Sequence, residues 1–175
     1  MPGSHVSVAV VADRPALIRE AGVLRWLEWG HGDPSPDAWV AVTAREAGRD
    51  VLPVTLVAVD AGGSAVGVVG LDVEDDALTY QERGGRTPWL VGMVVRQDSR
   101  HCGIGRLLMD ALADVARARG HGRMWVVTGG EAVAYYRACG WSEVEQLPAA
   151  AQRPTSTVLT LLFSETGAAP ARLER

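Results

Sequence analysis

Two glycines and two arginines stand close together where an apolar segment gives way to a helical pattern. The segment reads Arg100-His101-Cys102-Gly103-Ile104-Gly105-Arg106. The N-terminus of a helix presents backbone N–H groups without partners and a partial positive charge, so it attracts anions. Gly103 and Gly105 would let a phosphate approach the backbone closely, and the arginines add positive charge. The segment therefore predicts a phosphate-binding loop.

Two common nucleotide-binding patterns do not fit this loop. A dinucleotide loop, GxGxxG, needs a third glycine where Leu108 stands, and the P-loop pattern GxxxxGK[ST] is absent from the sequence. The pattern present is Arg-x-x-Gly-x-Gly, formed by Arg100, Gly103 and Gly105. The alternative interpretation is a tight turn ahead of a helix, with no ligand.

Two adjacent tyrosines, Tyr135 and Tyr136, precede the pair Gly140-Trp141. A phenol is neutral at pH 7 and can donate a proton to a leaving group. On a helix, neighbouring side chains point about 100° apart, so the two hydroxyls cannot address the same atom. The alternative for either residue is core packing with a hydrogen-bonded hydroxyl, and we expect this role for Tyr135.

The hydrophobic patterns place the loop between a strand and a long helix. Residues 89–95 are apolar throughout, as in a central strand that is covered on both faces. Apolar residues between 103 and 119 recur at i, i+3, i+4 and i+7, which predicts an amphipathic helix that Gly120 ends. We expect the other strands at residues 5–12, 54–60, 65–72, 124–128, 140–145 and 157–163, and the other helices near 13–30, 37–49 and 131–138.

This order, β-α-α-β-β-β-α-β-α-β-β, predicts a mixed α/β sandwich (an α+β fold with a mixed sheet) rather than a doubly wound fold. In the first helix, Asp13 is a good N-cap ahead of Pro15. Four apolar residues of that helix recur at helical spacing and predict its buried face, namely Leu17, Ala21, Leu24 and Leu27.

The composition is that of one globular domain. The chain has 175 residues, of which 47% are apolar and 22% are charged, and this apolar fraction excludes intrinsic disorder. We expect one domain over residues 1–164 and a flexible tail at 165–175, where no periodicity is present. The net charge of −4 argues against a nucleic-acid partner.

Cysteine and histidine usage predicts a cytoplasmic chain without a metal. Two cysteines, Cys102 and Cys139, are too few for a disulfide framework, so free thiols are expected. The four histidines show no metal-ligand spacing. The sequence has no signal peptide pattern and no apolar stretch near the roughly 20 residues that a membrane span needs. We therefore expect neither a membrane nor a metal partner.

Together these motifs resemble the GCN5-related N-acetyltransferases (GNAT). The segment from Arg100 to Gly105 is similar to the acyl-CoA pyrophosphate loop of that family, and the order of elements is also the family's. A second segment looks like the family's [FY]-Y-x-x-x-G-[FW] motif, namely Ala134-Tyr135-Tyr136-Arg137-Ala138-Cys139-Gly140-Trp141. Thr87-Pro88-Trp89-Leu90 leads into the strand as in small bacterial members. The resemblance is strongest over 87–141 and extends over 6–163.

The resemblance implies an acetyl-CoA-dependent N-acetyltransferase that moves an acetyl group to a primary amine by direct attack in a ternary complex. It implies a strand bulge, for which Gly92 is suited, and a splayed pair of central strands; the alternative is that Gly92 relieves crowding under a helix. The Met93 N–H would face the thioester oxygen, and Val94-Val95 would lie along pantetheine, with the Val95 backbone pairing to it. Tyr136 matches the tyrosine that protonates the departing sulfur.

The loop residues would bind the cofactor, namely Arg100, His101, Cys102, Gly103, Ile104, Gly105 and Arg106. His101 and Cys102 stand where the family often has glycine and a basic residue. Backbone N–H groups do most of the binding, so we expect affinity for acetyl-CoA to survive in weakened form. Cys102, at a helix N-terminus beside Arg100, has the setting of a nucleophile, but bound pyrophosphate would cover it.

The general base is left open. Glu28 is the leading candidate, because it ends the first helix, where this fold often lines the acceptor cleft; the alternatives are a solvated surface carboxylate, a water chain, or one of Asp72, Glu74 and Glu82. Trp26 and Trp29 either pack on the sheet or wall the acceptor pocket.

Two further questions stay open at the level of sequence. A non-catalytic acyl-CoA-binding or partner-binding module with the same fold is the alternative to an enzyme. The acceptor is an amine-bearing small molecule or a peptide, and a homodimer is compatible with the sequence.

Overall fold

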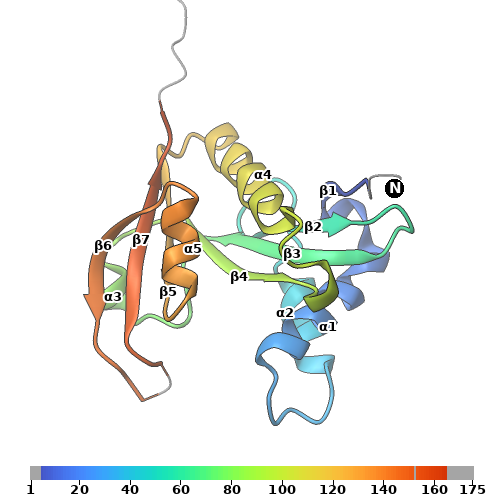
Figure 1. Cartoon of the computed structure of the whole chain (residues 1–175), viewed down its shortest axis with the longest axis horizontal. Helices are drawn as coiled ribbons and strands as arrows, with labels where there is room; N and C mark the ends of the chain where they lie inside the picture. Colours follow the sequence, from blue (N-terminus) through green and yellow to red (C-terminus); the bar gives the residue numbers. More distant parts are fainter. Residues whose placement is uncertain (1–4, 152, 165–175) are drawn as a thin grey trace, which may run out of the picture.

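Seven strands form one mixed sheet in the order β1-β2-β3-β4-β5-β7-β6 (Figure 1). The structure is a computed structural model that describes residues 5–151 and 153–164. Neighbouring strands run antiparallel except for β4 and β5, which are parallel. The strands are β1 (Ser7–Val10), β2 (Val54–Val59), β3 (Ala65–Asp72), β4 (Trp89–Val95), β5 (Arg123–Thr128), β6 (Ser142–Leu147) and β7 (Ser156–Leu162).

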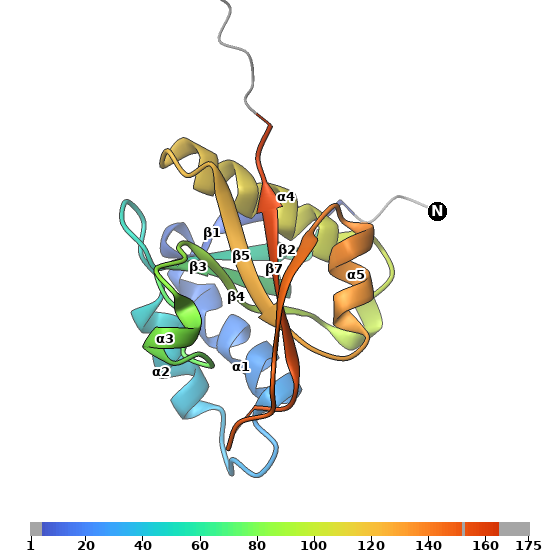
Figure 2. The same cartoon turned by 90° about the vertical axis from the view of Figure 1, so that its left-hand side faces the viewer.

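Helices cover both faces of this sheet. They are α1 (Ile18–Trp29), α2 (Asp37–Arg45), α3 (Tyr80–Arg83), α4 (Ile104–Ala118) and α5 (Ala132–Ala138), with 3-10 turns η1 (Val11–Asp13), η2 (Pro15–Leu17) and η3 (Gln97–Ser99). The long helix α4 lies on one side of β2, β3 and β4, and α1 and α2 lie on the other (Figures 1 and 2). This is the predicted mixed α/β architecture.

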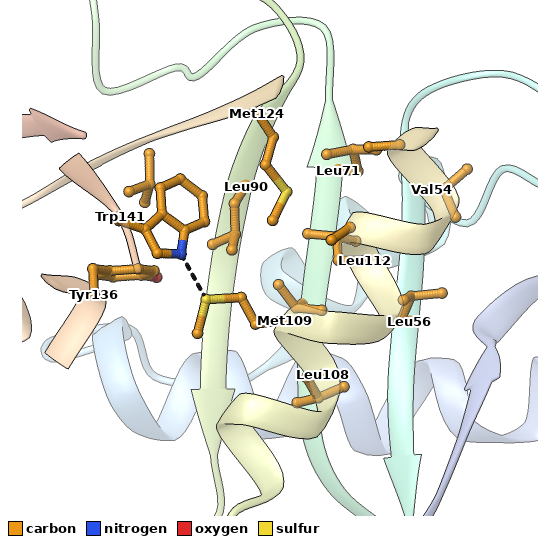
Figure 3. Close-up of a cluster of buried hydrophobic side chains, with 14 of the residues drawn as sticks. Val54, Leu56, Leu71, Leu90, Leu108, Met109, Leu112, Met124, Tyr136 and Trp141 are labelled. Atoms are coloured by element: carbon orange, nitrogen blue, oxygen red, sulfur yellow. Dashed lines mark hydrogen bonds between the residues drawn. The ribbon is translucent and has the colours of Figure 1, made fainter. Parts of the chain in front are cut away.

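The larger core lies between the sheet and the helices α4 and α5. Leu108, Met109 and Leu112 of α4 are fully or almost fully buried there. The indole N–H of Trp141 donates to the Met109 sulfur at 2.9 Å, with the ring of Tyr136 beside it (Figure 3). Burying these large side chains is the main source of stability for the layer, and it holds α5 against α4.

The first helix begins later than the sequence predicts. Asp13 is not its N-cap: it lies in η1 and forms an ion pair with Arg49. The residue before a proline is pushed out of the helical region, and Arg14 accordingly has an extended φ of −134°. The chain therefore makes two 3-10 turns before α1 starts at Ile18.

Two other details of the helices differ from expectation. Leu27 is not on the buried face of α1, because its side chain is 60% exposed, while Arg25 takes an inward position. The second helix ends at Arg45 rather than near residue 49. Between β3 and β4, where the sequence predicts no helix, the chain also forms α3, whose start is closed by a capping box between Thr79 and Glu82.

In the described ranges, no helix is long and apolar enough to cross a membrane. No group of three or more His, Cys, Asp or Glu side chains suited to a metal ion occurs among the described residues either. The expected tail at 165–175 lies outside the described residues.

Candidate active site

A bulge in β4 opens the sheet at its centre. Between the pairs Val68–Val94 and Gly70–Val91, β4 contains one residue more than β3, so the register shifts. Gly92 lies in this bulge with φ of +55°, a left-handed value that favours glycine. β4 and β5 are paired at one register position, Trp89 with Trp125. The predicted bulge and splayed strand pair are thus confirmed.

A groove follows the splayed edge of β4. One part, with a volume of about 420 Å³, is lined by Glu28, Gly92, Met93 and Tyr136, among others. A second part, of about 390 Å³, shares Glu28 and Met93 with the first and continues along Val94 and Val95 to the loop before α4. The structure therefore brings together residues from α1, β4, α5 and the loop that the sequence predicted for one site.

The loop before α4 leaves donors available at the end of this groove. Gly103 caps the helix with φ of +81°, and the space where its Cβ would lie is open. The first backbone hydrogen bond of the helix runs from the Leu107 N–H to the Gly103 carbonyl at 3.0 Å. The N–H groups of Ile104, Gly105 and Arg106 therefore have no acceptor within the described helix and face outward. These features fit a bound pyrophosphate.

His101 adopts the backbone geometry that a glycine would have at this position. Its φ is +61°, a strained value for a residue with a side chain. Cys102, beside it, is exposed. The departure at His101 therefore keeps the shape of the loop at a cost of about 1–2 kcal/mol in backbone strain.

Both arginines of the loop are paired with carboxylates. Arg100 donates from Nη2 to Glu28 Oε2 at 2.6 Å and from Nε to the Val95 carbonyl at 2.9 Å. Arg106 donates from Nε to both oxygens of Asp110, at 2.8 and 3.0 Å, and this contact raises the pKa of its guanidinium. Exposed pairs of this kind contribute little to stability, so a phosphate can compete for either arginine.

The core-packing role that the sequence suggested for Tyr135 falls to Tyr136 instead. The expectation of core packing for Tyr135 is wrong: it is 39% exposed, whereas Tyr136 is 5% exposed. The ring of Tyr136 meets Trp141 edge to face at 5.3 Å. The Tyr135 hydroxyl lies over Gly105, 2.6 Å from where a Cβ would be. The rotation of α5 about its axis turns Tyr136 toward the core, where its side chain also lines the groove.

Burial raises the pKa of both phenols. Desolvation, followed by the charges of Tyr135 and Cys139, raises the pKa of Tyr136 well above its ordinary value near 10. Desolvation and the Cys139 thiol raise the pKa of Tyr135 to about 12. Each hydroxyl is therefore available as a proton donor throughout the physiological pH range.

The sequence comparison decides the family. Residues 20–141 match the model described as the acetyltransferase (GNAT) family. The chain belongs to this family. Acetyl-CoA is the acetyl donor of GNAT proteins, which confirms the predicted cofactor. A search of curated proteins finds no match.

Solved structures share the GNAT fold at low sequence identity. An aminoglycoside 6'-N-acetyltransferase complexed with coenzyme A has a TM-score of 0.70 and 16% identity over 90% of this chain and 96% of that one. Ard1 from Thermoplasma volcanium has a TM-score of 0.67 and 16% identity over 91% and 99%. A chimera of the spermidine N-acetyltransferase SpeG from Vibrio cholerae and hSSAT has a TM-score of 0.65 and 17% identity over 91% and 96%. These likenesses show the fold.

The carboxylates near the GNAT groove include one that sequence reasoning missed. Asp75 lines the groove together with Glu28, and burial is the main cause that raises its pKa. Its Oδ1 accepts the Ala77 N–H at 2.9 Å. The only sequence signal for Asp75 is the acidic run Glu74-Asp75-Asp76. The other candidates are engaged elsewhere: Glu74 pairs with Arg83, Glu82 pairs with Arg153, and Asp72 accepts the Val73 N–H.

One tryptophan of α1 walls the groove. Trp29 is 43% exposed, lines the groove beside Glu28, and stacks on Trp39 with ring centroids 6.2 Å apart. Trp26 donates its indole N–H to the Asp33 carbonyl at 3.3 Å. Trp29 therefore lines the groove rather than packing on the sheet.

Proposed function

We propose that this chain is an N-acetyltransferase that moves an acetyl group from acetyl-CoA to a primary amine by direct attack in a ternary complex. The observation that carries the proposal is the continuity of one groove. It runs from the loop before α4, along the bulged strand β4, to Tyr136 and two carboxylates. Such a groove can hold a long anionic donor and an amine in line.

The donor end is assigned to the loop and the strand edge. Outward N–H groups and the side chains of Arg100 and Arg106 would hold the pyrophosphate, together with His101, Cys102 and Ile104 of the same loop. The backbone of Val94 and Val95 would lie along pantetheine, because the splay leaves that edge of β4 without a neighbouring strand. The Met93 N–H would then donate to the acyl oxygen and stabilise its developing charge.

The reaction needs two proton movements. Acetyl-CoA supplies a thioester carbon: the amine nitrogen forms a bond to it, and the carbon–sulfur bond breaks. The Tyr136 hydroxyl, which its raised pKa keeps protonated, donates a proton to the departing sulfur. A carboxylate accepts the proton that the amine loses, and we assign this to Glu28, with Asp75 as the second carboxylate in reach of the groove.

The acceptor end favours an amine that carries positive charge. Glu28 and Asp75 are acidic, and the exposed face of Trp29 suits a cation. Solved neighbours that are named for aminoglycoside and spermidine acetylation support an amine-bearing small molecule, and a peptide amine fits the same chemistry. We propose a small cationic amine as the acceptor.

Thiol release in an acceptor screen tests this function. Purified protein is incubated with acetyl-CoA and a panel of polyamines, amino sugars and peptides, and products are identified by mass spectrometry. We expect thiol release that requires both the protein and one class of amine, with an acetylated product. Binding of acetyl-CoA without thiol release would favour the alternative, a non-catalytic acyl-CoA-binding module. Absence of acetyl-CoA binding would contradict both.

A further inference from the structure

A buried cation lies directly under the bulge of β4. Arg25, on α1, is 3% exposed, although arginine is rarely buried to this degree. It lies one helical turn before Glu28 and Trp29, which line the groove above it. An arginine guanidinium carries a delocalised positive charge. A permanent positive charge is therefore held in a dry site beside the proposed reaction centre.

One edge of this guanidinium is paired and the other is not. Nη1 donates to Glu46 Oε2 at 2.5 Å and to Thr43 Oγ1 at 3.3 Å. Nε and Nη2 have no hydrogen-bond partner within the part of the chain that the structure describes. Leaving charged donors without partners in a buried site is costly, so the arrangement calls for an explanation other than stability.

The unpaired edge faces the bulge. A Cβ on Gly92 would lie 3.0 Å from Nε and 3.1 Å from Nη2, and a Cβ on Gly70 would lie 3.2 Å from Nη2. These two strand glycines therefore make room for the guanidinium, which lies against the backbone that precedes Met93. Because Glu46 is on the opposite edge, the ion pair forms a dipole whose positive end points at the bulge.

We propose that Arg25 is a positioning residue for acyl transfer. It holds Gly92 in its left-handed conformation and adds positive potential at the Met93 N–H, which strengthens the polarisation of the acyl oxygen. The effect is large in a site from which water is excluded, because charge is weakly screened there. The inference rests on the proposed function, which places the acyl oxygen at this N–H.

The stretching frequency of the acyl carbonyl is the readout that a merely structural role would not move. Isotope-edited infrared spectra are recorded for acetyl-CoA, labelled with ¹³C at the carbonyl, bound to wild type, Arg25→Met and Arg25→Lys. The matched control is Arg19→Met, an exposed arginine on the same helix. Wild type and the control should lower the frequency relative to free acetyl-CoA. Arg25→Met should lose at least about half of that downshift, and Arg25→Lys should keep more of it.

Kinetics separate positioning from folding. Arg25→Met should lower kcat by about tenfold or more, while the Kd for coenzyme A, which lacks the acyl oxygen, stays within about threefold. A carbonyl frequency equal to that of wild type would overturn the proposal. So would equal losses of kcat and coenzyme A affinity without a change in frequency, because that is the signature of a structural role.

A second variant applies if Arg25→Met does not fold. Glu46→Gln removes the negative end of the dipole and leaves the guanidinium in place, so the carbonyl frequency should fall further below the wild-type value. An unchanged or raised frequency in Glu46→Gln would contradict the inference. Failure of the proposed function is distinct: wild type itself would then show no acetyl-CoA binding or no thiol release.

Discussion

Arg100 and Glu28 face each other across the groove, with Arg100 Nη2 2.6 Å from Glu28 Oε2. Arg100 also donates to the Val95 carbonyl at 2.9 Å. In the proposed function, Val95 pairs with pantetheine, Arg100 meets phosphate, and Glu28 meets the amine. The same side chain therefore ties together three groups that acetyl-CoA and the acceptor would use, and its contacts must exchange when they bind.

Breaking this pair from its two ends should give opposite results for donor binding. Glu28→Gln frees Arg100 for phosphate, so the Kd for acetyl-CoA should stay equal or fall, while kcat/KM for the amine falls by about tenfold or more. Arg100→Ala should raise the Kd for acetyl-CoA by about fivefold or more, because an ion pair to phosphate is lost. Calorimetry measures the Kd for acetyl-CoA in each variant, and steady-state kinetics measures kcat/KM for the amine. Equal weakening of acetyl-CoA binding by the two substitutions would contradict the assigned roles.

The raised pKa of Tyr136 predicts a loss of stability in alkali. The folded state holds the phenolic proton to a higher pH than the unfolded state, whose pKa is near 10. The contribution is complete below pH 10, and above it the free energy of unfolding should fall by about 1.4 kcal/mol per pH unit for this one proton. Urea unfolding between pH 8 and 11 measures the slope. Tyr136→Phe should reduce this slope, and a slope in Tyr136→Phe equal to that of wild type would contradict a raised pKa for Tyr136.

Relief of backbone strain at His101 should stabilise the fold. Its φ of +61° suits glycine, so His101→Gly should raise the free energy of unfolding by about 0.5–1 kcal/mol. Gly103→Ala should lower it by about 1 kcal/mol, because φ there is +81°. Denaturant unfolding at fixed pH compares the two variants. A loss of stability in His101→Gly would mean that the imidazole makes a stabilising contact.

The raised pKa of Asp75 predicts a gain in stability for Asp75→Asn at neutral pH. Desolvation by burial is the main cause of the shift, so folding favours the protonated acid, and stability is lost as pH rises through the folded pKa. The variant should exceed wild type in Tm at pH 7, and the difference should shrink at acid pH. If Asp75 also accepts the amine proton, the acid limb of the kcat/KM profile should move in the variant. A lower Tm at pH 7 would contradict the shift.

Local patterns predict the framework of this protein well. β3 and β4 lie where the sequence places them, at 65–72 and 89–95, because their apolar runs and flanking glycine turns act over a few residues. The loop before α4 and the bulge at Gly92 are equally local features, since each depends on backbone conformations that favour glycine.

The parts that sequence reasoning missed depend on distant partners. Arg25 is a charge on a helix until Gly70 and Gly92 of two strands make room for it. Asp75 belongs to an acidic run until folding buries it beside the groove. Likewise, Tyr136 rather than Tyr135 packs in the core because of how α5 is rotated against it, which the spacing of two adjacent residues does not determine.

The turnover of Tyr136→Phe with acetyl-CoA and an accepted amine tests the central claim most directly. Tyr135→Phe is the matched control, since it removes the neighbouring hydroxyl from the same helix. The account predicts that kcat falls by about 10²-fold or more in Tyr136→Phe, the usual size of a lost general acid, with the Kd for acetyl-CoA within about threefold of wild type. Wild-type kcat in Tyr136→Phe across the pH range, or an equal loss in Tyr135→Phe, would contradict it.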